Sequence, residues 1–462
     1  MISYLYGIVT RAMSPLIHNN GLPSPVSQDG TDNSGTKPVV KDDLLNELAG
    51  SISTNAQLLS TYLHSEGHPV PSFERNAAPK TVPASAPGEV QAAREALLDA
   101  SMKMFQLASG PSEYLPNLAV QYQYLSCLHW LIHFGILARV PLNGSISYAA
   151  LAADAGVPER TLKTVARMAM TSHVLCEVQP GFIAHSATSA QFVTNPSMND
   201  WAEFMCQGSV PAALSLVKAT ERWPTSQSRT ETAYNAAFET ELPFFDHLAT
   251  LPDRTRQFAG YMKNVTSSEG TKLDHLLSGF DWSGLGTARV VDVGGSTGNA
   301  GIALANSFPE LDVTVQDLSE NAAEGAATLK PDLASRVHFQ AHDFFQPQPI
   351  VGADIYLLRM ILHDWATPDA VRILQQLVPA LRRGSRIVIM DSVLPRPGSV
   401  APTKERLLRV RDLTMLQVFN SCERDLDDWN QVLSLADERL RLVDVAQPRG
   451  SVMSLLTISL AD

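Results

Sequence analysis

The sequence feature that most constrains the fold is the stretch Val290–Gly298, which reads Val-Val-Asp-Val-Gly-Gly-Ser-Thr-Gly. Valines around a lone carboxylate favour a β-strand, and the small residues that follow favour a turn. Residues 300–305 are then typical of the start of a helix. Strand, glycine turn and helix open the nucleotide-binding α/β sheets, because glycines admit a close ligand and a helix start presents free N–H groups.

The spacing of the small residues separates two ligand classes. A dinucleotide fingerprint needs Gly-x-Gly-x-x-Gly, but counting from Gly294 places Ser296 and Asn299 at the second and third glycine positions. The register Asp-x-Gly-x-(Gly/Ser)-x-Gly fits instead, at Asp292, Gly294, Ser296 and Gly298. This register resembles motif I of class I S-adenosylmethionine-dependent methyltransferases. The alternative interpretation is an ordinary strand-to-helix turn.

Four further strands are predicted downstream, and each is followed by polar residues. The strands cover residues 313–317, 337–341, 354–358 and 386–390. The residues at or just beyond their ends include Asp317, Asp343, Arg359, His363 and Asp391. Open α/β sheets hold their ligands at the carboxyl ends of parallel strands. Asp317 is therefore expected to accept hydrogen bonds from ribose hydroxyls, and Asp343 with Phe344 is expected to contact an adenine.

The bulk properties exclude several classes of function. Lys and Arg number 35 against 47 Asp and Glu, a net charge of −12, whereas nucleic-acid binding depends on a basic surface. The four cysteines have no metal-ligand spacing, which favours reduced thiols. No convincing signal peptide is present, and no run approaches the roughly 20 apolar residues of a membrane span. These features predict a cytoplasmic protein without a membrane partner.

The order of patterns along the chain predicts four regions. Residues 1–43 form a flexible leader, residues 44–200 a helical domain, residues 201–277 linking helices that contribute to a substrate pocket, and residues 278–462 the catalytic domain. In the third region, Phe244, Phe245 and Met262 are either pocket residues for a flat substrate or ordinary core.

The helical domain contains a pattern typical of a winged helix. Two helices at residues 148–157 and 159–170 precede a two-stranded wing at residues 174–185. DNA binding is one interpretation, but the second helix offers few basic side chains and the whole chain is acidic. A dimerisation module is the favoured interpretation.

His363 is the candidate general base. Methyl transfer is an in-line displacement, so the protein mainly positions the acceptor and removes its proton. A phenol with a pKa near 10 is a weak nucleophile at neutral pH, and a neutral imidazole beside it takes the proton. The imidazole needs a carboxylate to fix its tautomer. Asp391 is one candidate for that role, and Glu423 is another.

The chain resembles the plant-type O-methyltransferase family. More closely it resembles the fungal branch that acts on aromatic polyketides, including the enzymes of sterigmatocystin- and aflatoxin-type pathways. The resemblance runs from about Leu44 to the C-terminus. The segments that carry it are residues 291–298, 315–318, 341–345, 348–349, 352–359, 361–365, 391–395 and 412–415.

The resemblance implies a Rossmann-like methyltransferase domain with a mostly parallel seven-stranded sheet, preceded by a helical and winged-helix dimerisation domain. It implies an intertwined homodimer. No metal is expected, because a histidine base rather than a cation activates the hydroxyl. His363 would be the general base, flanked by Asp391 and Glu423. The residues that would hold S-adenosylmethionine are Gly294, Gly295, Asp317, Asp343, Phe344 and Arg359.

Two positions depart from the plant pattern. Asp391 stands where the plant enzymes have Glu, and its shorter side chain is expected to give a longer hydrogen bond to His363. Arg359 replaces a Lys that the plant enzymes usually have at that position.

The expected activity is O-methylation of a phenolic, polyketide-derived secondary metabolite. Methylation of nitrogen or a carboxylate on the same fold, and a non-catalytic subunit that binds S-adenosylmethionine, are the alternatives. The identity of the substrate is not determined by these motifs.

Overall fold

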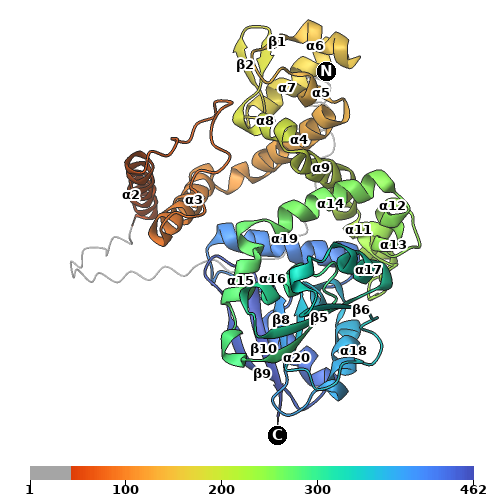
Figure 1. The fold of residues 1–462 in the computed structure, drawn as a ribbon. Coiled ribbons are helices and arrows are strands. Elements are labelled where there is room, and N and C mark those ends of the chain that lie inside the picture. Colours follow the sequence, from red (N-terminus) through yellow and green to blue (C-terminus); the bar gives the residue numbers. More distant parts are fainter. Residues whose placement is uncertain (1–42, 462) are drawn as a thin grey trace, which may run out of the picture. The chain divides into compact units, whose positions relative to one another are not determined.

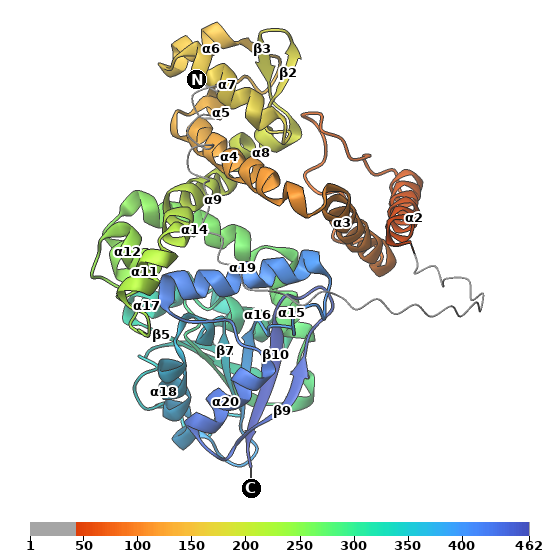
Figure 2. The same ribbon diagram turned by 180° about the vertical axis from the view of Figure 1, so that it is seen from behind.

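The computed structural model describes residues 43–461, so nearly all of the leader predicted for residues 1–43 lies outside the described part. Helices α2 (Leu44–Ser65) and α3 (Gly88–Ser109) lie side by side (Figures 1 and 2). Their apolar faces and the segment between them share a small core of Leu59, Val82, Ala86, Val90 and Ala93. In the described part of the chain, no helix is both long and apolar enough to cross a membrane.

A second group of elements has a core of its own. It comprises α4 (Tyr114–His133), α5 (Ile136–Arg139), β1 (Ile146–Ser147), α6 (Tyr148–Ala155), α7 (Glu159–Met170), β2 (Cys176–Gln179), β3 (Phe182–Ala184) and α8 (Ala187–Thr194). The strands form an antiparallel sheet in the order β1-β3-β2. Helices α6 and α7 and the β2–β3 hairpin lie where the sequence predicts them. Ser147 caps α6 by accepting a hydrogen bond from the Ala150 amide (3.2 Å).

A run of short helices connects this group to the large sheet. They are α9 (Pro196–Phe204), the π-helix η2 (Met205–Ser209), α10 (Val210–Leu214), α11 (Leu216–Arg222), α12 (Ala233–Phe238), α13 (Phe244–Ala249), α14 (Pro252–Thr266), η3 (Glu269–Thr271), α15 (Leu273–Ser278) and η4 (Ser283–Leu285). Helix α9 lies along α14 (Figure 2). An ion pair between Arg256 and Asp200 and a hydrogen bond from Gln257 to Glu203 (2.8 Å) join these two helices.

The seven-stranded sheet has the order β6-β5-β4-β7-β8-β10-β9. Its strands are β4 (Ala288–Val293), β5 (Leu311–Asp317), β6 (Val337–Ala341), β7 (Ile355–Arg359), β8 (Arg386–Asp391), β9 (Leu440–Ala446) and β10 (Ser454–Leu460). The first five in chain order pair in parallel, and β10 is antiparallel to both β8 and β9. The expected mostly parallel, seven-stranded sheet is confirmed.

Helices cover both faces of this sheet (Figures 1 and 2). One face carries α18 (Thr367–Leu377) and α20 (Leu426–Ala436), packed on Val291, Val293 and other buried side chains. The other face carries α15, α16 (Asn299–Ser307) and α17 (Ser319–Thr328). Helix α19 (Pro402–Phe419) runs across the carboxyl ends of the strands.

Two glycines make the β4–α16 turn possible. Gly294 has a φ of +72° and Gly298 has a φ of +87°, both in the left-handed region that favours glycine. A Cβ added at Gly298 would lie 2.7 Å from the Phe339 ring, so no larger residue fits without displacement. The turn is therefore specified by backbone conformation and by close packing.

Replacing Gly298 with Ala should destabilise the protein through both effects. Gly384 provides the matched control, because its φ is +89° but nothing lies within 4 Å of an added Cβ. We expect Gly384→Ala to cost about 1–2 kcal/mol and Gly298→Ala to cost roughly 1–3 kcal/mol more. Urea unfolding followed by circular dichroism measures the difference. Equal losses in the two variants would show that packing against Phe339 contributes nothing.

Candidate active site

A cavity of about 340 Å³ lies at the carboxyl ends of β4 and β7. It is lined by the glycine turn after β4, by residues between Arg359 at the end of β7 and Asp364, and by α14 and α19 among other helices. Because β4 and β7 are neighbours and run in the same direction, these two loops meet at one edge of the sheet. The sheet order therefore explains why residues far apart in sequence share one cavity.

Three of the predicted cofactor residues line this cavity, namely Gly294, Gly295 and Arg359. A Cβ at Gly294 would lie 2.7 Å from Ile361 and 3.4 Å from the Phe344 ring, so the glycine keeps the backbone accessible from the cavity. Arg359 donates a hydrogen bond to the Thr271 carbonyl (2.8 Å), while its buried Nε has no partner among the described residues.

The remaining predicted cofactor residues lie at adjacent strand ends, outside the cavity lining. The Asp317 carboxylate accepts hydrogen bonds from the Ser296 amide, the Leu318 amide and the Asn321 side chain, at 2.7–2.8 Å. It thereby joins the end of β5 to the glycine turn. Asp343 accepts a hydrogen bond from the Phe345 amide (2.9 Å) and is exposed, and Phe344 is half-buried.

His363 lies on a short turn, η6 (Leu362–Asp364), just beyond β7. Its Nδ1 atom is 3.1 Å from Oε1 of Glu423, whose side chain is 2% exposed. Its Nε2 atom is 3.6 Å from Oδ1 of Asp364. His363, Asp364 and Glu423 all line the cavity. The structure thus pairs the candidate base with Glu423, one of its two candidate carboxylates. This pairing uses Nδ1, so Nε2 is the ring nitrogen that could take a proton from a substrate.

Asp391 is close to this group but does not bond to it. It is 1% exposed at the end of β8, and neither carboxylate oxygen has a hydrogen-bond partner among the described residues. The expected long hydrogen bond from Asp391 to His363 is therefore absent. The reason is that Glu423, which comes from another loop, already occupies the Nδ1 position of His363. Asp391 instead acts on His363 through its charge.

The charges around His363 determine its protonation. Burial lowers the pKa of His363, but the carboxylates of Asp364, Asp391 and Glu423 raise it more, and the resulting pKa is about 10. Burial raises the pKa of Asp391 to about 7. At neutral pH the imidazole therefore carries a proton that offsets the buried carboxylates. Because the pKa is above the value of about 6.5 in an unfolded chain, this stabilisation is complete below about pH 6.5 and is lost as the pH rises toward 10.

Aromatic side chains form a wall of the cavity. They come from α9, α12, α13, α14 and α19 and include Phe204, Tyr234, Phe244, Phe245, Phe258, Tyr261 and Phe419. Their rings pack at centroid distances of 4.7–6.4 Å with one another and with neighbouring rings. Phe244, Phe245 and Met262, which the sequence left as either pocket or core, line this wall. The cavity therefore combines an aromatic wall with the imidazole of His363.

Sequence reasoning missed several residues near His363. Asp364 was part of a recognised motif but was not assigned a role, although it follows His363 directly. Arg229 lies over the Trp365 ring, with 4.3 Å from its guanidinium carbon to the ring centroid. No sequence signal identifies Arg229, because it comes from the loop before α12, more than a hundred residues away. Arg424 was also given no role. The only sequence signal for it is its position directly after Glu423, a candidate site residue.

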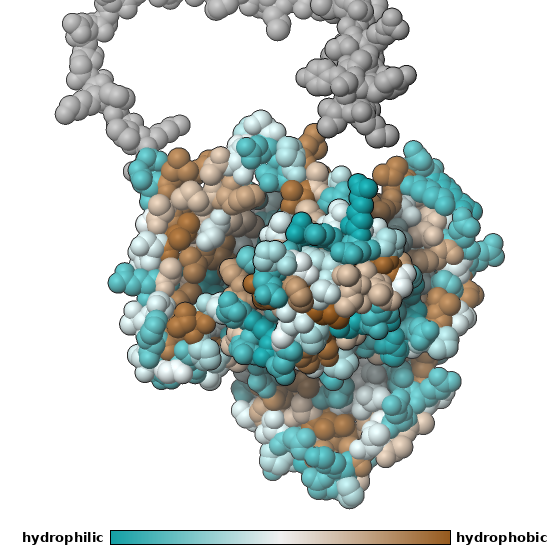
Figure 3. All heavy atoms as spheres, turned by 90° about the horizontal axis from the view of Figure 1, so that it is seen from above, coloured by the Kyte–Doolittle hydropathy of each residue, from teal (hydrophilic) through white to brown (hydrophobic). Residues whose placement is uncertain are grey.

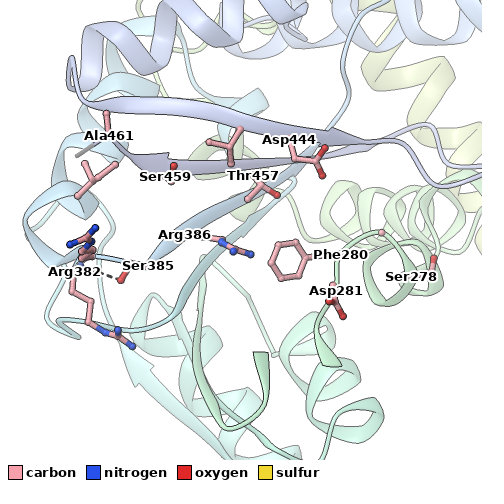
Figure 4. A pocket seen from close by; sticks show the side chains of 15 residues that line it. Ser278, Phe280, Asp281, Arg382, Ser385, Arg386, Asp444, Thr457, Ser459 and Ala461 are labelled. Carbon is pink, nitrogen blue, oxygen red and sulfur yellow. Dashed lines mark hydrogen bonds between the residues drawn. The ribbon is translucent and has the colours of Figure 1, made fainter. Parts of the chain in front are cut away.

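A larger open groove, of about 1070 Å³, lies at the opposite edge of the sheet (Figure 4). It surrounds the beginning of β8 and the end of β10, where the Arg386 guanidinium lies 5.9 Å from the centroid of the Phe280 ring. None of the predicted site residues lines it. Ligands bind open α/β sheets at the carboxyl ends of the strands, so the smaller cavity is the candidate active site.

The sheet order and the glycine turn define a Rossmann-like methyltransferase fold, and comparison with known proteins agrees. The solved structure of OxaC superposes with a TM-score of 0.70 over 90% of this chain and 98% of that chain, at 20% identity. OxaC has also been solved in complex with SAH and oxaline. Because the two sequences are only 20% identical, this likeness shows a shared fold and nothing further.

Sequence relatives establish the family. Residues 223–437 match the O-methyltransferase domain family. The O-methyltransferase aoiF of Aspergillus oryzae is 49% identical over 422 residues, which cover 90% of this chain and 100% of aoiF. The O-methyltransferase aurJ of Gibberella zeae is 49% identical over 430 residues, covering 91% of this chain and 98% of aurJ. The chain belongs to this family of fungal secondary-metabolite O-methyltransferases, and it is an O-methyltransferase.

Replacing Glu423 with Gln should lower the pKa of His363, because it removes a carboxylate that raises this pKa. Selective ¹³C labelling of histidine and an NMR titration of the ring signal measure the pKa. Asp343→Asn is the control, since it removes an equal charge that is not among the groups acting on His363. We expect a pKa of about 10 in the unchanged protein and the control. A pKa that is the same in all three proteins would contradict the assigned electrostatics.

Proposed function

We propose that the enzyme uses S-adenosylmethionine to methylate a phenolic hydroxyl of an aromatic, polyketide-derived secondary metabolite, with His363 as the general base. The observation that carries this proposal is the arrangement of one imidazole. His363 lines a cavity with an aromatic wall, and buried Glu423 holds its Nδ1 atom at 3.1 Å. A carboxylate on one ring nitrogen orients the other nitrogen for proton transfer.

The residues around the glycine turn fit S-adenosylmethionine. The backbone at Gly294 and Gly295 faces the cavity without side chains. The Nε of Arg359, which has no partner within the described part of the chain, suits a ligand carboxylate. Asp317 is held against the turn at the end of β5, and Asp343 and Phe344 follow β6, as the family resemblance implies for the adenosine. The SAH found with OxaC supports the same choice.

Buried negative charge also suits this cofactor, which is cationic at sulfur. Asp292 is 1% exposed and accepts a hydrogen bond from the Gly301 amide (3.0 Å). Burial raises the pKa of Asp292 to about 6 and the pKa of Asp391 to about 7. A nearby cation would favour the ionised form of both carboxyls.

The chemistry divides between the cofactor and the chain. S-adenosylmethionine, when bound, supplies an electrophilic methyl group on a sulfonium sulfur. The chain positions the phenol against the aromatic wall and removes its proton. The O–H bond of the phenol breaks, its proton goes to Nε2 of His363, and the electron pair stays on the phenol oxygen. Glu423 and Asp364 stabilise the imidazolium. No metal takes part in the proposed step.

The carboxylates around His363 also strengthen it as a base. A phenol has a pKa near 10, and these carboxylates raise the pKa of His363 well above its usual value, so the imidazole takes the proton of a phenol more favourably. Rates should consequently rise with pH above neutrality, as the neutral imidazole becomes more abundant. A weaker base would be neutral at pH 7 but would transfer the proton less favourably.

Replacing His363 with Ala should lower turnover by roughly 10²–10⁴-fold and leave S-adenosylmethionine affinity nearly unchanged, because a general base acts on the acceptor. Release of S-adenosylhomocysteine, with hydroxylated xanthones, anthraquinones and simpler phenols, measures turnover. Calorimetry measures cofactor affinity.

The same assay separates the alternatives. Turnover that is indifferent to His363 would overturn the proposed mechanism and favour methylation of nitrogen or a carboxylate. Tight cofactor binding without methylation of any acceptor in the panel would favour a non-catalytic role. His338→Ala is the matched control, because this histidine is exposed on β6 and pairs with Asp312 at 3.1 Å, away from the cavity.

A homodimer is the second part of the proposal. Helix α4 presents a row of exposed apolar side chains, with Tyr114, Leu118 and Tyr122 on one face and Leu115 beside them, at 49–70% exposure. Exposed apolar side chains also lie on α3 and α19. Figure 3 shows apolar areas (brown) among the polar ones on the face viewed there. Exposed apolar patches of this kind mark protein–protein contacts, and a second copy of the chain is the proposed partner.

Replacing Leu115 with Glu should convert the dimer to a monomer, because it places a charge in the apolar row. Leu435→Glu is the control, since Leu435 is 55% exposed on α20, away from α4. Sedimentation velocity measures the mass of each protein. A mass unchanged by Leu115→Glu, or a protein that is already monomeric before substitution, would contradict a dimer through α4.

A further inference from the structure

We propose that Arg424 is a positioning residue that fixes the turn carrying His363, together with Ser421. This inference rests on the proposed function, since it concerns the base of that reaction. Arg424 is 1% exposed and is among the largest fully buried side chains of the protein. It lies at the end of the segment Ser421–Arg424, which also provides Glu423.

The segment holds the turn by its backbone carbonyls. Arg424 donates hydrogen bonds from Nη1 to the Leu362 carbonyl and from Nη2 to the Trp365 carbonyl, both at 2.7 Å. The Ser421 hydroxyl donates to the carbonyl of His363 itself, at 2.6 Å. Three carbonyls within four residues are thus bound from one short segment, and the same segment places Glu423 on the imidazole.

The turn needs such support because regular secondary structure does not determine it. Met360, just before it, has a φ of +55°, a left-handed conformation that is unfavourable for a residue with a side chain. The turn η6 spans only Leu362–Asp364. Backbone strain next to a functional group persists only when surrounding contacts impose it. The Met360 amide is held by the Met390 carbonyl at 3.0 Å, and Arg424 and Ser421 hold the carbonyls that follow it.

The holding segment is itself fixed to the sheet. The Leu394 amide donates to the Arg424 carbonyl at 2.9 Å, which ties the segment to the chain leaving β8. The Glu423 amide donates to Asp412 on α19 at 3.1 Å. The Arg424 guanidinium lies 5.3 Å from the centre of the Trp429 ring on α20. A rigid support on several elements can therefore transmit its geometry to the imidazole.

An arginine is required by this geometry. Its planar guanidinium directs two N–H groups to separate acceptors, whereas a lysine ammonium is a single point on a flexible chain. A lysine at position 424 keeps the positive charge but cannot bind the Leu362 and Trp365 carbonyls as a fork. Arg424→Lys therefore separates positioning from charge.

The test is a double-mutant cycle with Arg424→Lys and His363→Ala in the full-length protein. We expect Arg424→Lys to lower kcat by about 10–100-fold, with KM for the phenol and the S-adenosylmethionine affinity within about twofold of the unchanged protein. In the His363→Ala background the same substitution should change turnover by less than about threefold, because its effect acts through the missing imidazole. The His363 pKa measured by NMR should also shift toward 6.5 as the imidazole leaves its carboxylates.

Two further variants separate the positioning effect from a general loss of stability. Arg336→Lys is matched, because Arg336 also binds backbone carbonyls, those of Ala305 (2.8 Å) and Leu311 (3.4 Å), but far from His363. It should leave kcat of the folded enzyme unchanged. Ser421→Ala removes one hydroxyl only, so it tests the same turn if Arg424→Lys fails to fold. We expect it to lower kcat by about 3–10-fold with an unchanged KM.

The outcomes distinguish the inference from the function on which it rests. Equal losses from Arg424→Lys with and without His363, or full activity and an unchanged His363 pKa in both Arg424→Lys and Ser421→Ala, would overturn the positioning role. Full activity of His363→Ala would instead overturn the proposed function. Two results together would support both the positioning role and the proposed function. His363→Ala would lose activity, and Arg424→Lys would lower kcat only when His363 is present.

Discussion

The parallel pairing of β4 with β7 on one side and with β5 on the other is the constraint on which the rest of the structure depends. Parallel neighbours bring their carboxyl ends to the same edge of a sheet, so the loops that follow them must meet. The glycine turn after β4, Asp317 at the end of β5 and the His363 turn after β7 are all products of this pairing. The cavity exists because the strand order juxtaposes the loops after β4 and β7, and Asp317 ties the end of β5 to the first of them.

Charge is concentrated where these loops meet. Asp364, Asp391 and Glu423 surround His363, and the oxygens of Asp391 are buried without hydrogen bonds among the described residues. Unpartnered buried carboxyls are costly to a fold. In the proposed function, these carboxylates serve a purpose: they raise the pKa of the base and favour a cationic ligand. The buried Arg424 supplies compensating charge close to this group.

The cavity has two sides that differ in how their sequence is constrained. The side around the glycine turn is built from backbone and from short motifs, so few substitutions are compatible with it, as the left-handed glycines show. The aromatic side is built from side chains on α9, α12, α13, α14 and α19. Rings in such a wall can be exchanged for other apolar side chains without changing the backbone. The aromatic wall can therefore diverge in sequence while the glycine turn stays the same.

The seven-stranded, mostly parallel sheet was expected from the family resemblance, whereas the sequence by itself determined the local elements: the strand, turn and helix at 288–307, the strands that end in polar residues, and the hairpin at 176–184. These follow from periodicity and from residues with special backbone preferences, which act over a few neighbours. Tertiary structure alone decided that Glu423 and not Asp391 bonds to His363, and that Ser421 and Arg424 hold its turn. These contacts join residues about sixty positions apart, so they depend on how the elements pack, which no local pattern specifies.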